Sequence, residues 1–143
     1  KYSKCVKLIT NLGIGGAVQT GIKYAFQNGY DFAIQIDGDG QHPPDQILRL
    51  LQAQQNTQAD LVVGSRFIDH DTFRSSFTRR LGIGLISGSL KILYQQTITD
   101  PTSGLRLINR NGMKLFSKYY PVDFPEPVSL AHALENKLKV DLT

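Results

Sequence analysis

Two aspartates spaced two residues apart follow a short apolar run in the first third of the chain. Asp37 and Asp39 come directly after segment 32–36, whose alternating apolar residues predict a β-strand. Carboxylates at the end of a strand offer the hard oxygen ligands that Mg²⁺ and Mn²⁺ prefer. The glycines beside them would let a bulky phosphate approach closely. The spacing therefore points to a divalent-cation site that binds a phosphate-bearing ligand.

A turn offers a second interpretation of the same residues. Asp-Gly sequences are common in turns, and Asp45 could cap the following helix, so the pair does not by itself establish a metal site. The nearby His42 is weak evidence for zinc on its own, and we interpret it as structural or as lying at the edge of a substrate.

The elements that must position these residues alternate along the chain. The patterns predict strands over 6–9, 32–36, 60–64, 105–108 and 138–142. They predict helices from the glycine-rich turn to about 28, from 44 to 58, over 77–94 and 111–119, and after a cap at Ser129. Segment 121–127 reads as a loop, either at the active edge or a plain connector. Such alternation is typical of an α/β fold with a mostly parallel sheet flanked by helices. Ligands bind at the carboxyl ends of the strands in such sheets, where the two aspartates fall.

Composition narrows the class of protein. The 143 residues, 41% hydrophobic and 20% charged, suit one domain over 1–143. A single cysteine, Cys5, excludes an internal disulfide and a Cys-rich zinc site. The net charge is +4, and its local concentration of arginines favours an anionic ligand; we expect no nucleic-acid binding, because basic and aromatic residues are not interleaved. No apolar run reaches the roughly 18 residues that a membrane span needs.

Several further residues have both a chemical and an ordinary interpretation. Arg66 and Arg80 could bind a phosphate with paired hydrogen bonds, or could simply be solvated. Asp100 and Glu126 stand in turn-rich segments that could hold a general base, although turns also use such residues as caps. The glycine-interrupted helix over 77–94 could be a homodimer face, a membrane-facing surface or core, and these three readings stay open.

Five motifs, in order, resemble those of inverting family 2 glycosyltransferases of the GT-A fold, in the branch of the polyprenyl-phosphate sugar synthases. They are Asn11-x-Gly13-x-Gly15-Gly16, Asp37-Gly-Asp39-Gly-Gln41, Gly64-Ser-Arg66, Asp100-Pro-Thr-Ser-Gly-Leu-Arg106 and Phe124-Pro-Glu-Pro127. Their common order over most of the chain makes the resemblance far more specific than any one motif.

The resemblance implies a site for each part of the reaction. Asp37, Asp39 and Gln41 would hold Mg²⁺ or Mn²⁺, which binds the diphosphate of a nucleotide-sugar donor, and Gly15 and Gly16 would contact substrate. The acceptor would be a polyprenyl phosphate or a cell-envelope glycan, with Arg66 and Arg80 facing its phosphate and Asp100 and Arg106 lining the sugar end. Asp100 or Glu126 would act as the base for a hydroxyl acceptor. It also implies a cytoplasmic location at the inner face of the membrane, with peripheral association.

Two departures from the family pattern qualify these expectations. The family normally has a strand and an acidic nucleotide-recognition segment upstream of the position of Lys1, so we expect a GT-A fold incomplete at its N-terminus and weak donor binding by this chain alone. The sequence also has Val128 where relatives often carry a second glutamate after Pro127.

Two alternative functions stay open: a sugar nucleotidyltransferase and a non-catalytic binding module. The nucleotidyltransferase would need Arg and Lys in the glycine-rich loop, and residues 13–17 contain neither.

Overall fold

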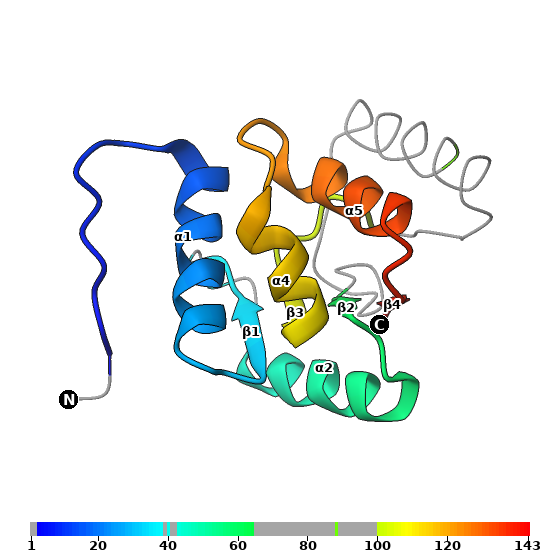
Figure 1. The fold of residues 1–143 in the computed structure, drawn as a ribbon. Coiled ribbons are helices and arrows are strands. Elements are labelled where there is room, and N and C mark those ends of the chain that lie inside the picture. Colours follow the sequence, from blue (N-terminus) through cyan, green and yellow to red (C-terminus); the bar gives the residue numbers. More distant parts are fainter. Residues whose placement is uncertain (1–2, 39, 41–42, 65–87, 89–99) are drawn as a thin grey trace.

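Helices and strands alternate along the part of the chain that the structure describes. A computed structural model describes residues 3–38, 40, 43–64, 88 and 100–143. The elements are α1 (Gly13–Gln27), β1 (Phe32–Gln35), α2 (Pro44–Thr57), β2 (Leu61–Val63), β3 (Arg106–Asn109), α4 (Arg110–Lys118), α5 (Pro125–Glu135) and β4 (Val140–Leu142) (Figure 1). The predicted helix over 77–94 lies outside the described residues except for Gly88.

The sheet corrects one prediction. Its strand order is β1-β3-β2-β4, and β3 runs antiparallel to both β1 and β2, while only β2 and β4 pair in parallel. The α/β class with flanking helices is confirmed, but the expectation of a mostly parallel sheet is wrong. The β1-α2-β2 crossover does leave β1 and β2 pointing the same way, with a gap of one strand between them. β3 fills this gap. It begins beside the carboxyl ends of β1 and β2, so it runs in the direction opposite to both strands.

Helices cover both faces of this sheet. On one face, α1, α4 and α5 pack over Leu61, Val63 and Ile108, and the core they enclose includes the α4 residues Met113 and Phe116. On the other face, α2 packs over the side chains that alternate with these, and Leu50, Ala59, Val62, Leu105 and Leu107 are all buried there. Figure 1 shows α2 below the sheet, α1 to its left, α4 in front of β3 and α5 at the upper right. The period-two alternation of the strands supplies both apolar layers.

The helices begin where their local chemistry allows. Pro44 occupies the first turn of α2, where its missing N–H costs nothing, and Asp45 lies inside that turn rather than at its cap. Pro125 likewise starts α5. The predictions of a loop over 121–127 and of a helix cap at Ser129 are therefore wrong: the helix begins at Pro125, and Ser129 lies buried on its second turn. A proline that ends a loop and one that opens a helix look alike in sequence.

The segment before α1 also differs from its prediction. No strand is assigned over residues 6–9, and the side chain of Ile9 is fully exposed there. A strand is stable only when a neighbour satisfies its backbone groups, and no described strand pairs with this segment. Its apolar alternation therefore does not produce a strand among the described residues.

Asp60, the residue just before β2, connects three other elements through hydrogen bonds to its carboxylate. Its carboxylate accepts hydrogen bonds from Asn109 Nδ2 at 2.9 Å, from Asn111 Nδ2 at 3.1 Å and from the Lys139 backbone N–H at 2.9 Å. The side-chain oxygen of Asn109 in turn caps α4 by accepting from the Gly112 N–H at 3.0 Å. These contacts hold β3, α4 and the start of β4 in register at the sheet edge opposite the aspartate motif.

Candidate functional site

The carboxyl ends of β1 and β2 and the start of β3 meet at one edge of the sheet. The Gly64 N–H donates to the Leu105 carbonyl at 2.9 Å, and the Ser103 hydroxyl donates to the Gly64 carbonyl. Asp37 follows β1 at this same edge. Because β3 is antiparallel, its incoming loop rather than its end lies here, and this places the Asp100 motif beside the aspartate motif.

Asp37 contacts the main chain of Gly104. The Asp37 side chain is exposed, and a Cβ built on Gly104 would lie 2.8 Å from the Asp37 Cγ, nearer than atoms can approach. A glycine is therefore required at position 104 for this carboxylate to take its place. The backbone of Gly104 is not in the left-handed region, so the requirement is one of space.

Arg106 lies beneath this edge and is only 1% exposed. Its Nε donates to the Ser103 carbonyl at 2.9 Å and one terminal nitrogen donates to the Ser129 hydroxyl at 2.7 Å. The other terminal nitrogen donates to the carbonyls of Pro101 at 3.2 Å and Glu126 at 2.8 Å. The guanidinium therefore ties the turn before β3 to the first turn of α5. We predicted that Arg106 lines the sugar end of the site; its guanidinium is buried among these loops, and a contact with substrate stays a prediction.

Burial lowers the pKa of the Arg106 guanidinium, while electrostatic interactions with Tyr120 and with the carboxylates of Glu126, Asp100 and Asp37 act in the opposite direction. Arginine nevertheless stays protonated near neutral pH. The three predicted carboxylates thus share one buried cation as an electrostatic neighbour. The fold brings Asp37, Asp100 and Glu126 to one region although 89 positions separate the first and last in sequence, since 126 minus 37 is 89.

Asp100 is buried and shapes its own turn. Its Oδ1 accepts from the Thr102 N–H at 3.3 Å and from the Thr102 hydroxyl at 3.0 Å. This is the local pattern by which aspartate stabilises a turn. The side chain is 1% exposed. These contacts support the turn-forming interpretation, and the role of Asp100 as a base stays a prediction.

Glu126 is half-buried in the first turn of α5 and follows a strained residue. Phe124, the residue before the helix, has φ +48° and ψ +53° and a side chain that is 79% exposed. The left-handed conformation is rare for a bulky side chain and costs free energy. Strain of this kind persists where the surroundings hold the backbone, and here Arg106 binds the carbonyl of Glu126, two residues after Phe124.

The glycines at the start of α1 pack tightly. A Cβ on Gly15 would lie 2.8 Å from the Cα of Val122 and closer still to the Pro121 carbonyl oxygen, and a Cβ on Gly16 would overlap Leu12. The Gly15 contact holds α1 against the loop that leads to Glu126, whereas the Gly16 contact lies at the start of α1 itself. A direct contact of either glycine with substrate stays a prediction.

Four residues of the predicted site lie outside the described residues: Asp39, Gln41, Arg66 and Arg80. In the part of the chain that the structure describes, no cluster of three or more His, Cys, Asp or Glu side chains has the spacing of a metal site. Asp37 is thus the only one of the three proposed metal ligands whose surroundings the structure describes, and its exposed carboxylate offers the oxygen donors that a hard cation takes.

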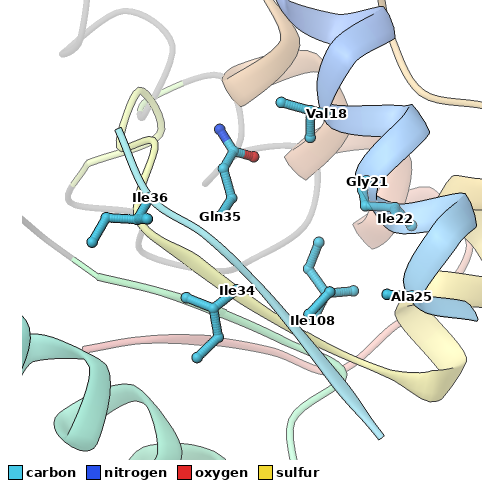
Figure 2. Close-up of a pocket in the computed structure, with 9 residues that line it drawn as sticks. Val18, Gly21, Ile22, Ala25, Ile34, Gln35, Ile36 and Ile108 are labelled. Carbon is cyan, nitrogen blue, oxygen red and sulfur yellow. The ribbon is translucent and has the colours of Figure 1, made fainter. Parts of the chain in front are cut away.

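An apolar groove of about 380 Å³ lies beside the site, between α1 and β1. Figure 2 shows Val18, Gly21 and Ile22 of α1 across the groove from Gln35 and Ile108. None of the described residues that line it is charged. A diphosphate needs cationic or N–H partners, so this groove does not suit the charged part of a nucleotide.

The comparison with known proteins now decides the family. The sequence pattern described as "Glycosyl transferase family 2" matches residues 3–117. The chain belongs to glycosyl transferase family 2. The match includes β1, β2, β3 and most of α4, and therefore the Asp37 and Asp100 motifs that meet at the sheet edge.

Three curated relatives of this family 2 chain have names that refer to polyprenyl-type lipids carrying a phosphate or a phosphosugar. A UDP-N-acetylglucosamine–dolichyl-phosphate N-acetylglucosaminyltransferase of Methanococcus voltae is 33% identical over 138 residues, 96% of this chain and 55% of the relative. An undecaprenyl-phosphate mannosyltransferase of Micrococcus luteus is 38% identical over 73% of this chain and 43% of the relative. A polyprenol monophosphomannose synthase of Mycolicibacterium smegmatis is 33% identical over 71% of this chain and 38% of the relative.

The family 2 chain spans about half the length of these relatives, or less. Within the residues that the structure describes, no helix combines the length and apolar character needed to cross a membrane.

Two residues of this family 2 site were missed by sequence reasoning. Ser129 was interpreted as a helix cap and Tyr120 was not singled out, yet both are buried beside Arg106. One feature of the sequence indicates that such buried polar partners exist. An arginine inside the apolar run Leu105-Arg106-Leu107-Ile108 predicts a buried cation, which needs several polar partners. The sequence does not say which distant residues those partners are.

Proposed function

We propose that the complete protein carrying this chain transfers a sugar from a nucleotide-diphosphate donor to a polyprenyl phosphate. One observation carries the proposal: in a family 2 chain, Asp37 lies against Gly104 at the sheet edge where the Asp100 and Glu126 segments converge. The names of the curated relatives support the class of acceptor.

Asp37, with Asp39 and Gln41, would hold Mg²⁺ or Mn²⁺ in this proposal. The exposed carboxylate of Asp37 and the absence of a side chain on Gly104 fit such a cation, because they leave oxygen donors and room for a phosphate. When bound, the cation supplies positive charge that stabilises the departing nucleoside diphosphate. The role of Asp37 itself is to place its oxygens at the strand end.

The surroundings of Asp100 support a phosphate acceptor over a hydroxyl acceptor. A phosphate is ionised near neutral pH and attacks without losing a proton, whereas a hydroxyl needs a general base. Asp100 is buried and bonds its own turn, so it is poorly placed to receive a proton. Glu126 remains the candidate base for a hydroxyl acceptor because it is only half-buried.

The acceptor phosphate needs cations. We propose that Arg66 and Arg80 bind it through paired hydrogen bonds. Arg106 has a different role in this proposal. Its N–H groups already donate to four oxygen atoms of the protein, so it stabilises the loops of the site and does not bind the acceptor phosphate itself. A lipid acceptor would bring the protein to a membrane surface by peripheral association.

The test is a transfer assay with the complete protein. A panel of nucleotide sugars is incubated with a short-chain polyprenyl phosphate and Mg²⁺ or Mn²⁺, and lipid-linked sugar is measured. We expect transfer that is lost with a chelator and restored by the cation, and a fall of at least a hundredfold in Asp37→Asn.

Asp31→Asn is the matched control, because Asp31 is also exposed but precedes β1 at its other end. Unchanged transfer in Asp37→Asn would exclude the metal role. Transfer only to a hydroxyl-bearing glycan would exclude the lipid-phosphate acceptor while leaving glycosyl transfer intact.

A further inference from the structure

A buried chain of polar side chains connects β1 to α5. The Tyr120 hydroxyl donates to Gln35 Oε1 at 3.4 Å and lies beside the Ser129 hydroxyl. The Ser129 oxygen accepts from Arg106 at 2.7 Å and its hydroxyl donates to the Glu126 carbonyl at 3.1 Å. Neighbouring side chains thus lead from Gln35 at the end of β1 through Tyr120 and Ser129 to the buried guanidinium of Arg106, and we call this series the path.

The ends of this path bear directly on the site. Gln35 lies two residues before Asp37, so any shift of Gln35 along the strand moves that carboxylate. At the other end, Arg106 binds the carbonyls of Pro101 and Ser103, which flank the turn after Asp100. Ser129 and Arg106 both bind the Glu126 carbonyl. The path therefore touches all three segments that carry the predicted carboxylates.

Water cannot easily replace these contacts. Ser129 is completely buried, and Tyr120 is 4% exposed. Burial raises the pKa of the Tyr120 hydroxyl, although the Arg106 charge and the neighbouring Ser129 hydroxyl act to lower it. Polar groups enclosed in this way hold one arrangement, because each broken bond leaves an unsatisfied group in an apolar setting.

We propose that Ser129 and Tyr120 are positioning residues that set the placement of the Asp100 and Glu126 segments relative to Asp37. The inference rests on the transfer reaction proposed above and adds two residues to it. Neither side chain lies at the open sheet edge, so each acts through Arg106 and Gln35 rather than on substrate. A small displacement of reacting groups costs much rate, which is why such support matters for catalysis.

The kinetic test uses variants of the complete protein that remove single hydroxyl groups. Ser129→Ala and Tyr120→Phe should each lower kcat for sugar transfer roughly tenfold to a hundredfold with little change in the donor KM. The double variant should cost no more than the more damaging single one, because both act through one path.

Ser117→Ala and Tyr119→Phe are the controls. The Ser117 hydroxyl bonds a carbonyl of its own helix, and Tyr119 is exposed beside Tyr120. Both should retain wild-type kcat. Folded Ser129→Ala and Tyr120→Phe proteins with kcat within twofold of wild type would overturn the proposal, as would equal losses in the controls. If Ser129→Ala does not fold, Tyr120→Phe decides by the same criteria.

Hydrogen exchange gives a second readout that needs no activity. In Ser129→Ala, amide exchange should accelerate in 100–106 and in 124–130 together, while Ser117→Ala should leave both unchanged. Exchange that changes only around residue 129 would contradict a shared support for the two segments. Because this measurement does not depend on transfer, a failure of the proposed function and a failure of the positioning role give different results.

Discussion

The carboxylate of Asp37 lies against the main chain of Gly104, where any other residue would place its Cβ. The two residues belong to different motifs and are 67 positions apart, since 104 minus 37 is 67. Their contact is possible because β3 runs antiparallel between β1 and β2, which brings the loop before β3 to the end of β1.

Gly104→Ala tests this contact. The new methyl group would overlap the Asp37 carboxylate and displace it, so we expect sugar transfer by the complete protein to fall roughly tenfold or more. Folding should be nearly unaffected, because Asp37 is exposed and can move. Transfer rate and thermal midpoint are the measurements.

A second Gly104→Ala experiment separates displacement of Asp37 from other damage. The Asp37→Asn/Gly104→Ala double variant should be no less active than Asp37→Asn alone, because both changes disable the same carboxylate. Additive losses would show that Gly104 acts on the site by another route.

Gly15→Ala should destabilise the fold. Its methyl group would overlap the backbone at Pro121 and Val122, which cannot move aside as a flexible side chain can. We expect a loss of about 1–3 kcal/mol in the free energy of unfolding, as for other overpacked sites, measured by urea denaturation. Gly21→Ala on the same helix meets no atom within 4 Å and should gain about 0.5–1 kcal/mol. An equal effect of both substitutions would refute the packing role of Gly15.

Arg106→Lys should be strongly destabilising although the charge is kept. Lysine has no planar fork and cannot donate to the Ser103, Pro101 and Glu126 carbonyls and to Ser129 at once. A loss of about 2–4 kcal/mol in unfolding free energy follows from unsatisfied buried groups. Arg110→Lys is the control, because Arg110 is exposed. Similar unfolding midpoints for the two variants would contradict the structural role of Arg106.

Asp60 should make stability depend on pH. Burial acts to raise the pKa of its carboxyl, but hydrogen bonds from Lys139, Asn109 and Asn111 and the Lys139 charge outweigh burial and hold the pKa below its usual value. A lowered pKa stabilises the fold above the unfolded pKa of about 4, and that stabilisation is lost as pH falls through the folded value.

Asp60→Asn should therefore lower the unfolding free energy by roughly 1 kcal/mol at pH 7, a modest figure because the site is partly exposed. The difference from wild type should shrink as pH falls below about 4. Denaturant titrations at several pH values measure this, with Asp31→Asn as the exposed control. A difference that stays constant down to acidic pH would exclude ionisation of Asp60 as its source.

Much of the local structure was predictable from sequence. The apolar spacing of α1, the proline that opens α2 and the short apolar runs of β1 and β2 all depend on residues close together in the chain, and each prediction agrees with the structure within a few residues. The ordered motifs also led to the correct family, because their residue types and sequence order are themselves the pattern.

The arrangement of these elements depended on contacts between distant residues. Nothing in the run of β3 states that it enters between β1 and β2 in the opposite direction; its position follows from the gap left by the β1-α2-β2 crossover. The same limit applies to Ser129, whose local sequence resembles a helix cap, but whose partner is Arg106, 23 positions earlier.

The sequence by itself determined the candidate residues for chemistry, the approximate positions of α1, α2 and α4 and of most strands, and the family. Only the tertiary structure decided that Gly104 makes room for Asp37, that Arg106 is buried and joins two loops, and that Tyr120 and Ser129 lie buried beside it. The physical reason is that secondary structure responds to side-chain spacing within a few turns. Close packing and the pairing of a buried charge depend on which distant surfaces the folded chain brings together.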